Sequence, residues 1–177
     1  MRIREATVAD ARAIAEVHIT SWRVAYAGIV PAAHLASLSV DERESRWAKI
    51  LTGQDGTFTY VAVDEKGQVI GFASGGPLRE GDPAYAGELY AIYILPDHKG
   101  KGYGRRLAST VARRLAQMGM PSMLVWVLAD NYARGFYERL GGALVGEQIV
   151  NIGGAELREI AYGWPDTTTQ AMLAATE

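Results

Sequence analysis

The sequence predicts an α/β fold, in which a mixed central sheet of about seven strands is flanked by about four helices. Three observations predict it. The hydrophobic pattern alternates between strand and helix periods in the order βααβββαβαββ. A strand at 88–95, a helix at 104–118 and a strand at 122–128 form a βαβ unit, which requires two parallel strands. The 177 residues, 49% of them hydrophobic, suffice for one core, so we expect a single domain over 1–164 and a tail over 165–177.

The N-terminal part should contain one short strand and two helices. Residues 2–5 alternate between polar and apolar side chains, as a strand does. The capping signal Thr7-x-x-Asp10 then precedes a helix that we expect to end near Tyr26. A second signal, Ser39-x-x-Glu42, opens a helix that stops near Gly53.

Three strands and a long helix follow. Residues 57–63 and 69–74 are rich in β-forming side chains and flank the turn at 64–67, which predicts a hairpin. The next strand, at 88–95, comes after a loop rich in glycine and proline. From 104 to 118 the apolar residues recur at helical spacing, with arginines on the opposite face.

The C-terminal part should contain three strands and one helix. The apolar run at 122–128 is typical of a buried strand. A helix at 131–140 is terminated by the glycine pair at 141–142. Strands at 143–150 and 155–162 are joined by a turn that contains two glycines, which predicts a second hairpin.

Composition excludes several classes of protein. The formal net charge of −2, from 18 basic and 20 acidic residues, provides no general attraction for nucleic acid. There is no cysteine, and His18, His34 and His98 lack the spacing of metal ligands, so we expect no thiolate nucleophile and no metal. The N-terminus lacks a signal-peptide pattern, and no run approaches ~18 apolar residues. We therefore expect a soluble cytoplasmic protein without nucleic-acid or membrane partners.

Three glycines at alternate positions separate the strand at 88–95 from the helix that follows. Gly100, Gly102 and Gly104 lack a Cβ, so successive backbone N–H groups can approach an anion, and the helix N-terminus adds its own unpaired donors. This arrangement predicts a phosphate-binding loop. The spacing fits neither the dinucleotide motif Gly-x-Gly-x-x-Gly nor a Walker loop, which ends in Gly-Lys-Ser/Thr.

Two motifs resemble those of the GNAT superfamily of N-acetyltransferases. The segment Lys99-Gly100-Lys101-Gly102-Tyr103-Gly104 resembles the acetyl-coenzyme A (acetyl-CoA) loop of the family, Gln/Arg-x-x-Gly-x-Gly/Ala, with lysine in the first position. The segment Asn131-Tyr132-Ala133-Arg134-Gly135-Phe136-Tyr137 and its continuation to Gly142 resemble Asn-x-x-Ala-x-x-Phe-Tyr-x-x-x-Gly-Phe, from which only the last position departs. The two motifs follow each other in the family's order, and the order of elements resembles the GNAT fold over residues 1–164.

The resemblance implies that acetyl-CoA is the co-substrate and that no metal takes part. The backbone of the strand before the loop would pair with the pantetheine arm, and the loop would hold the phosphates. Lysine at 99 keeps a positive charge but lacks the planar group of the family residue. The implied coenzyme contacts are Ile92, Tyr93, Ile94, Lys99, Gly100, Lys101, Gly102, Tyr103, Gly104, Arg105, Asn131, Ala133 and Tyr137. For Asn131, helix capping alone is the alternative.

Tyr137 and Glu88 are the expected catalytic residues. The resemblance puts Tyr137 beside the coenzyme sulfur, where a protonated phenol can donate to the departing thiolate; packing in the core is the alternative. Glu88 occupies the place of the catalytic glutamate in GNAT histone acetyltransferases, so it is the expected general base. Ordered water is the alternative base, and a solvated strand-end glutamate is the alternative for Glu88. In a strictly alternating strand, Glu88 shares a face with Ile92 and Ile94.

The acceptor is less well defined. Trp22, Tyr26, Tyr90 and the loop at 75–87 lie where a GNAT fold places acceptor contacts, although aromatic residues at helical spacing are more often core. The resemblance implies direct acetyl transfer to a primary amine of a small molecule or peptide, and the absence of cysteine agrees with transfer without an acyl-enzyme. A coenzyme-binding sensor without transferase activity is the alternative. The C-terminal hairpin or the tail could mediate a homodimer.

Overall fold

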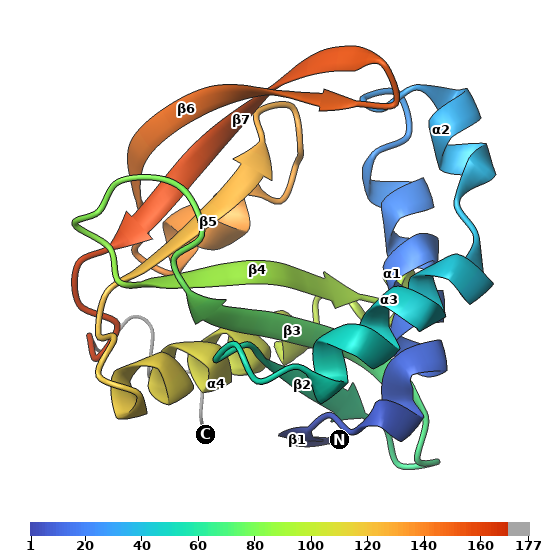
Figure 1. The fold of residues 1–177 in the computed structure, drawn as a ribbon, viewed down its shortest axis with the longest axis horizontal. Coiled ribbons are helices and arrows are strands. Elements are labelled where there is room, and N and C mark those ends of the chain that lie inside the picture. The colour runs from blue at the N-terminus through green and yellow to red at the C-terminus, as the bar shows by residue number, and fades with distance from the viewer. Residues whose placement is uncertain (170–177) are drawn as a thin grey trace.

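Seven strands form one mixed sheet in the computed structural model, which describes residues 1–169 (Figure 1). Their order across the sheet is β1-β2-β3-β4-β5-β7-β6. β4 and β5 are parallel and every other neighbouring pair is antiparallel, which confirms the mixed sheet. The strands are β1 (Arg2–Glu5), β2 (Phe58–Val63), β3 (Val69–Pro77), β4 (Gly87–Ile94), β5 (Met123–Leu128), β6 (Ala143–Ile152) and β7 (Ala155–Trp164).

Helices cover both faces of the sheet. One face carries α1 (Ala11–Ala25) and α3 (Val40–Thr52), whose apolar residues pack on β2 and β3. The other carries α4 (Tyr103–Gln117) and α5 (Arg134–Arg139). A further helix, α2 (Ala32–Ser37), was not predicted, because six residues after Pro31 are too few to show a helical period.

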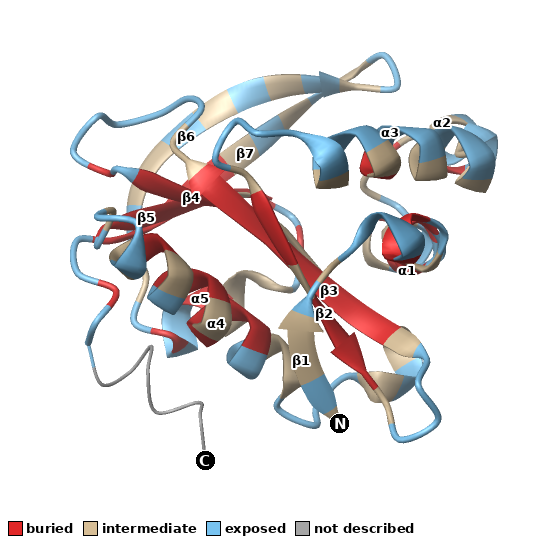
Figure 2. Ribbon diagram, turned by 60° about the horizontal axis from the view of Figure 1, so that its bottom comes forward, coloured by how far each residue is buried: buried red, intermediate tan, exposed pale blue. Residues whose placement is uncertain are grey.

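The core lies between the sheet and these helices. Figure 2 shows β3 and much of β4 buried in the centre of the molecule. The larger cluster joins α4 to the sheet through fully buried side chains such as Leu107, Val111, Leu115 and Leu89. Among residues 1–169, no helix is both long and apolar enough to cross a membrane.

A β-bulge interrupts β4. In the register between β3 and β4, Ser74 lies opposite Ala91, but Gly75 lies opposite Leu89, so Tyr90 is an extra residue. Because side chains alternate along a strand, one extra residue reverses which face each later side chain occupies.

The bulge corrects one expectation from the sequence. Leu89 packs in the same cluster as Ile92 and Ile94, on the side of α4. Glu88 precedes Leu89 and therefore points to the opposite face. The prediction that Glu88 shares a face with Ile92 and Ile94 is wrong, because strict alternation holds only in a strand without an inserted residue.

The parallel strands β4 and β5 separate soon after they begin. Their register contains only the pairs Gly87–Met123 and Glu88–Leu124. Beyond these pairs β4 continues along β3, whereas β5 continues along β7. A wedge therefore opens in the middle of the sheet.

The chain after β7 stays attached to the domain as far as it is described. The N–H of Thr167 donates to the carbonyl of Pro121 at 2.7 Å, and the Thr167 side chain is buried. Residues 170–177, most of the predicted tail, lie outside the described residues. Among residues 1–169, β6 pairs only with β7. Its outer edge can therefore accept another strand, and the homodimer stays a prediction.

Candidate active site

A cavity of about 710 Å³ occupies the wedge between β4 and β5, and we call it the wedge cavity. Its walls come from the two diverging strands, the glycine loop and the start of α4, the turn before α5, and α5 itself. Most of the expected coenzyme contacts line it: Ile92, Tyr93, Ile94, Lys99, Gly100, Gly102, Tyr103, Gly104, Arg105, Asn131, Ala133 and Tyr137. The fold therefore brings two motifs about thirty residues apart in the sequence to one cavity.

The backbone of β4 has an edge in this cavity that pairs with no other described strand, and the carbonyl of Ile94 there accepts a hydrogen bond from the Ser21 hydroxyl at 3.4 Å. The N–H of Leu95 bonds to the carbonyl of Ile70 on β3. Because successive residues of a strand direct their N–H and C=O groups to opposite sides, those of Tyr93 also face β3, whereas those of Ile92 and Ile94 face the wedge. There β5 has already diverged. An extended amide-bearing ligand can pair with this edge as an added strand.

The glycine loop has the geometry of an anion site. Gly100 and Gly102 have φ of 75° and 79°, and a Cβ at either position would meet no atom within 4 Å. Glycine is therefore required by the left-handed backbone conformation, and the space in front of both residues is open. Among the described residues, the N–H groups of 100–102 donate to no other protein atom. Gly102 is the N-cap of α4, whose first turn adds further donors.

The lysines of the loop differ in orientation. Lys99 extends to the β5–α5 turn, where its ammonium donates to the Tyr132 hydroxyl and lies 5.1 Å from the centre of that ring. Lys101 folds back instead and donates to the carbonyl of Asp97 at 3.1 Å, so the structure does not bring this expected contact to the wedge cavity. Arg105 lines the cavity at the first turn of α4.

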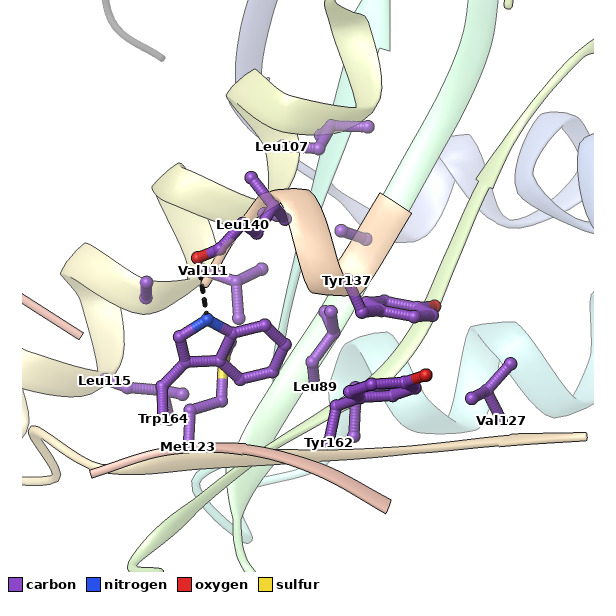
Figure 3. Packing of buried hydrophobic residues seen from close by; sticks show 14 of the residues in the cluster. Leu89, Leu107, Val111, Leu115, Met123, Val127, Tyr137, Leu140, Tyr162 and Trp164 are labelled. Atoms are coloured by element: carbon purple, nitrogen blue, oxygen red, sulfur yellow. Dashed lines mark hydrogen bonds between the residues drawn. The ribbon is translucent and has the colours of Figure 1, made fainter. Parts of the chain in front are cut away.

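Tyr137 stands at the inner wall of the wedge cavity. Its ring is stacked on Tyr162 at 5.9 Å between centroids and contacts Phe136 and Trp164 edge-on. Figure 3 shows the Tyr137 and Tyr162 hydroxyls on the same side, toward Val127. Burial, with a smaller contribution from Tyr26, raises the pKa of Tyr137 well above its usual value. The phenol therefore keeps its proton at neutral pH and can donate it.

Asn131 closes a turn beside the wedge cavity. Its side-chain oxygen accepts from the N–H of Ala133 at 2.9 Å, which closes the turn before α5. The residue is 6% exposed and lines the wedge cavity. The N-cap of α5 is Ala133, without a side-chain cap, so the interpretation of Asn131 as the helix cap is wrong, and its coenzyme contact stays a prediction.

A second cavity, of about 420 Å³, lies on the opposite face of β4, and we call it the side cavity. It is bounded by α1, the β3–β4 loop and the β6–β7 hairpin. The tip of this hairpin reaches α2 (Figure 1). There Gly153 leaves no room for a side chain, because its Cβ would lie 2.5 Å from the Cβ of His34.

Glu88 faces the side cavity in a tight ion pair. Its carboxylate accepts three hydrogen bonds from Arg79: from the backbone N–H at 3.0 Å, from Nε at 3.2 Å and from Nη2 at 2.6 Å. Glu88 is 2% exposed, whereas the Arg79 side chain is largely exposed. The Arg79 guanidinium also lies 4.1 Å from the centre of the Tyr90 ring. The charge of Glu88 is therefore already balanced.

The two cavities share one wall. Five residues line both, namely Tyr26, Tyr90, Tyr93, Trp126 and Val127. Within this wall the hydroxyls of Tyr26 and Tyr93 are 3.0 Å apart and hydrogen-bonded. Burial is the main cause that raises the pKa of both phenols. The wall thus carries two protonated hydroxyls between the cavities.

Trp22 and Tyr26 stand on the last turns of α1 beside this wall. Their rings contact each other edge-on at 4.8 Å, and Trp22 lines only the side cavity. One turn earlier on α1, His18 is stacked on Tyr93 at 5.0 Å and accepts a hydrogen bond from Nε1 of Trp47 at 3.2 Å. Burial, followed by the charge of Arg43, lowers the pKa of His18 to about 3, so this imidazole is neutral.

Comparisons with known proteins identify the family. Residues 82–150 match the family model described as FR47-like protein. The chain is 43% identical over 172 residues to YuaI of Bacillus subtilis, an uncharacterized N-acetyltransferase, and this covers 97% of the chain and 96% of the relative. The chain belongs to the GNAT superfamily of N-acetyltransferases.

Two further GNAT comparisons bear on the ligands. The L-amino acid N-acyltransferase MnaT of Escherichia coli is 30% identical over 156 residues, covering 86% of this chain and 85% of the relative. YncA of Salmonella typhimurium, solved with its cofactor acetyl-CoA, has a TM-score of 0.67 and 26% identity, covering 93% of this chain and 92% of that chain. These similarities support coenzyme A as co-substrate of this GNAT enzyme, and the open space before Gly100 and Gly102 fits its phosphates.

Sequence reasoning missed several residues of this GNAT site. His98 and Tyr132 line the wedge cavity, and Arg79 and Glu159 line the side cavity. Tyr132 lies at a variable position of the second motif, so the motif gives no reason to select it. Its side chain is 64% exposed in the folded chain, which the sequence does not show. Arg79 and Glu159 come from elements that pair only in the folded chain, and no spacing in the sequence brings them to Glu88 or Tyr26.

Proposed function

We propose that this GNAT enzyme transfers acetyl from acetyl-CoA to a primary amine by direct attack within a ternary complex. The shared wall of the two cavities carries the proposal, since a donor in the wedge cavity and an acceptor in the side cavity would meet there. No cysteine is present to form a thioester with the enzyme. Holding both reactants in one geometry is itself a large part of such catalysis.

The chain would hold the donor mainly through its backbone. The edge of β4 at Ile92 and Ile94 would pair with the pantetheine amides, and the N–H groups of 100–102 would bind the phosphates. Lys99 and Arg105 would add positive charge beside them. An N–H of the β4 edge would stabilise the oxyanion that forms when the thioester carbonyl is attacked.

Tyr137 would act as the general acid. Its raised pKa keeps the phenol protonated, and its position at the inner wall of the wedge cavity suits donation to the departing thiolate. The aromatic neighbours on either side hold the ring in one orientation. Glu88 as the general base stays a prediction; to act, its carboxylate would have to leave a partner that holds it at 2.6 Å.

The acceptor we propose is a small-molecule amine with an apolar part. MnaT is named for L-amino acids, and an L-methionine sulfoximine/L-methionine sulfone acetyltransferase of Pseudomonas aeruginosa matches half of the chain. In the side cavity, aromatic rings and the apolar residues Leu128, Val150 and Ile152 would surround the acceptor. One arginine and three glutamates line it, which favours a cationic group.

An acceptor panel tests the proposal. The enzyme is incubated with acetyl-CoA and, separately, with L-phenylalanine, L-methionine, L-phenylalaninamide, 2-phenylethylamine and a peptide with a free N-terminus. We expect release of coenzyme A and a product heavier by one acetyl group, detected by mass spectrometry, with small amines preferred over the peptide. Binding of acetyl-CoA without acetylation of any amine would instead support the coenzyme-binding sensor.

A further inference from the structure

Glu159 places a second carboxylate in the side cavity. It lies on β7, opposite Leu128 of β5 and Gln148 of β6. Its Oε2 accepts from Nε2 of Gln148 at 3.1 Å. Among the described residues its Oε1 accepts no hydrogen bond, and no cation lies within ion-pair distance of it. Glu159 therefore differs from Glu88, whose oxygens are both held by Arg79.

The strand geometry directs Glu159 toward the shared wall. Ile160 packs on the side of α4, and Leu157 packs with Tyr26 and Trp22. Because alternate residues share a face, Glu159 lies on the side of Leu157, which is the side of α1. Its negative charge contributes, after burial, to the raised pKa of Tyr26. The carboxylate is thus a neighbour of the hydroxyl pair formed by Tyr26 and Tyr93.

Few other charges face Glu159. α1 contributes Tyr26, and β4 contributes Glu88, Tyr90 and Tyr93. The β3–β4 loop contributes Arg79 and Glu80, and the neighbouring strands β5 and β6 line the cavity without a charged residue. Since Arg79 is already paired with Glu88, the carboxylate of Glu159 is free to bind an ammonium group.

We infer that Glu159 is the carboxylate that binds the ammonium group of the acceptor and accepts its proton during acetyl transfer. This inference rests on the proposed function and names the base that it leaves open. It assigns a different task to Glu88, which holds Arg79 over the Tyr90 ring and so shapes the wall of the cavity. The residue is a catalytic one, because it contacts the reacting amine.

The proton balance involves two protons of the acceptor. The bound ammonium group first gives one proton to the Glu159 carboxylate, which releases it to water and leaves a neutral amine. The amine nitrogen then forms a bond to the acetyl carbon and becomes acidic as it gains positive charge; this second proton goes to the Glu159 carboxylate. The bond from carbon to sulfur breaks, and Tyr137 gives its proton to the thiolate. The protonated Glu159 then restores the Tyr137 proton through the hydroxyls of Tyr26 and Tyr93, which are hydrogen-bonded at 3.0 Å. The net reaction moves one proton from nitrogen to sulfur and releases one proton of the ammonium group to water.

The need for this base depends on the acceptor. An alkyl amine with the basicity of lysine, pKa ~10.4, is neutral in roughly one molecule in 2,500 at pH 7, whereas an α-amine near ~8 is neutral in about one in ten. 2-Phenylethylamine represents the first kind and L-phenylalaninamide the second, and the two are similar in size. Loss of Glu159 should therefore impair the first acceptor more.

The experiment compares four variants in the full-length enzyme. Glu159→Gln removes the charge and keeps the shape; Glu159→Asp keeps the carboxylate. Glu156→Gln is the matched control, since Glu156 is an exposed glutamate on the same strand. Glu88→Gln tests the rival base. For each variant, kcat/KM is measured with both amines between pH 6 and 9, and acetyl-CoA affinity is measured by calorimetry to show an intact fold.

The outcomes separate the alternatives. We expect Glu159→Gln to lower kcat/KM about 10²-fold for 2-phenylethylamine and about tenfold for L-phenylalaninamide, with unchanged acetyl-CoA affinity. Glu159→Asp should recover part of the loss, and Glu156→Gln should match the wild type. Equal losses for both amines, or full activity of Glu159→Gln at every pH, would overturn the role of Glu159. A wild-type enzyme that binds acetyl-CoA and acetylates neither amine would overturn the proposed function instead.

Discussion

The wedge cavity and the side cavity are built in different ways. The wedge cavity depends on backbone: the edge of β4 that faces it, two glycines with positive φ, and the N-terminus of α4. Most of the residues that line it belong to two continuous stretches of sequence. The side cavity depends on side chains from five parts of the chain, α1, the β3–β4 loop, β4, β5 and the β6–β7 hairpin.

This difference implies that the two cavities respond differently to substitution. A backbone site tolerates many side chains, provided that glycine stays where φ is positive. A site that is built from side chains changes in shape and charge with each substitution. Such a substitution leaves the backbone groups that would bind the donor in place. We therefore expect variants to affect the donor and the acceptor separately, and four predictions test that separation.

The largest effect is expected from Gly102→Val on donor binding. The branched side chain would block the N–H groups that face the phosphates, and hydrogen bonds to charged groups are worth ~1.5–3 kcal/mol each, so losing two should weaken acetyl-CoA about 10³-fold. Gly119→Val is the control, because Gly119 has φ of 81°, against 79° for Gly102, and neither Cβ would meet an atom within 4 Å. Calorimetry showing equal acetyl-CoA affinity for both variants would contradict a phosphate site at Gly102.

The next prediction, slightly smaller in free energy, concerns the acid stability conferred by His18, which is stacked on Tyr93 in the wall of the side cavity. Burial lowers the pKa of His18 to about 3 from its usual value of 6.5, so the unfolded chain binds the proton more readily. Stability is therefore complete above pH ~6.5 and is lost as the pH falls toward ~3, by about 3 kcal/mol at pH 4. Thermal unfolding at pH 7 and pH 4 measures this loss.

The variant His18→Gln sharpens that prediction. Its side-chain oxygen can accept the hydrogen bond from Trp47 Nε1, but it does not titrate. The fall in Tm between pH 7 and pH 4 should be smaller than in the wild type. A separate loss of stability should remain in both proteins below pH ~4, where Asp10, whose pKa the Arg4 guanidinium lowers to about 2, loses its charge. An unchanged fall between pH 6.5 and 4 would assign the acid sensitivity to other groups.

Tyr137→Phe should lower kcat by about 10²-fold without changing acetyl-CoA affinity, because it removes only the hydroxyl that we propose as the proton donor. Tyr162→Phe is the control: its ring is stacked on Tyr137, but its hydroxyl donates to Glu138 at 2.6 Å. That variant should lose stability and keep its turnover. Steady-state rates that are equal for the two variants would remove Tyr137 from the mechanism.

The smallest effect is expected at the shared wall. Tyr26→Phe and Tyr93→Phe each break the hydroxyl pair, so either should slow turnover about tenfold by interrupting proton return. If the two hydroxyls act as one path, the double variant should be no slower than either single variant. Additive losses in a double-mutant cycle would show that each hydroxyl has a separate task.

The donor side could be predicted from the sequence because its signals are local. The sheet, the βαβ unit and the glycine loop follow from periodicity and from glycines at fixed spacing. The resemblance through 131–137 supplied residues that the fold does bring to the same cavity. Lys101 shows a limit of this reasoning. Its position in the motif predicted a coenzyme contact, but its ammonium donates to the carbonyl of Asp97 instead.

The charged residues of the side cavity could not be predicted in the same way, although Trp22, Tyr26 and Tyr90, the expected acceptor contacts, do line it. Arg79 meets Glu88 only because β3 and β4 are paired, and Glu159 meets Tyr26 only because β7 pairs with β5 and faces α1. Such meetings depend on register, which a single sequence specifies weakly. The unpredicted bulge at Tyr90 had the same origin, since one extra residue leaves no mark in an apolar run.

The bulge at Tyr90 divides β4 into two halves whose side chains alternate in opposite order. Before Tyr90, the even-numbered Glu88 faces the side cavity, whereas after it the even-numbered Ile92 and Ile94 pack on the side of α4. Even-numbered positions therefore face opposite sides in the two halves of the strand. A substitution of Glu88 would leave the orientation of the Ile92 and Ile94 side chains unchanged. Deleting Tyr90 would restore regular alternation, because Leu89 and Ala91 already lie opposite the consecutive residues Gly75 and Ser74. Both halves of the strand would keep their present faces, and the shared wall would lose one residue.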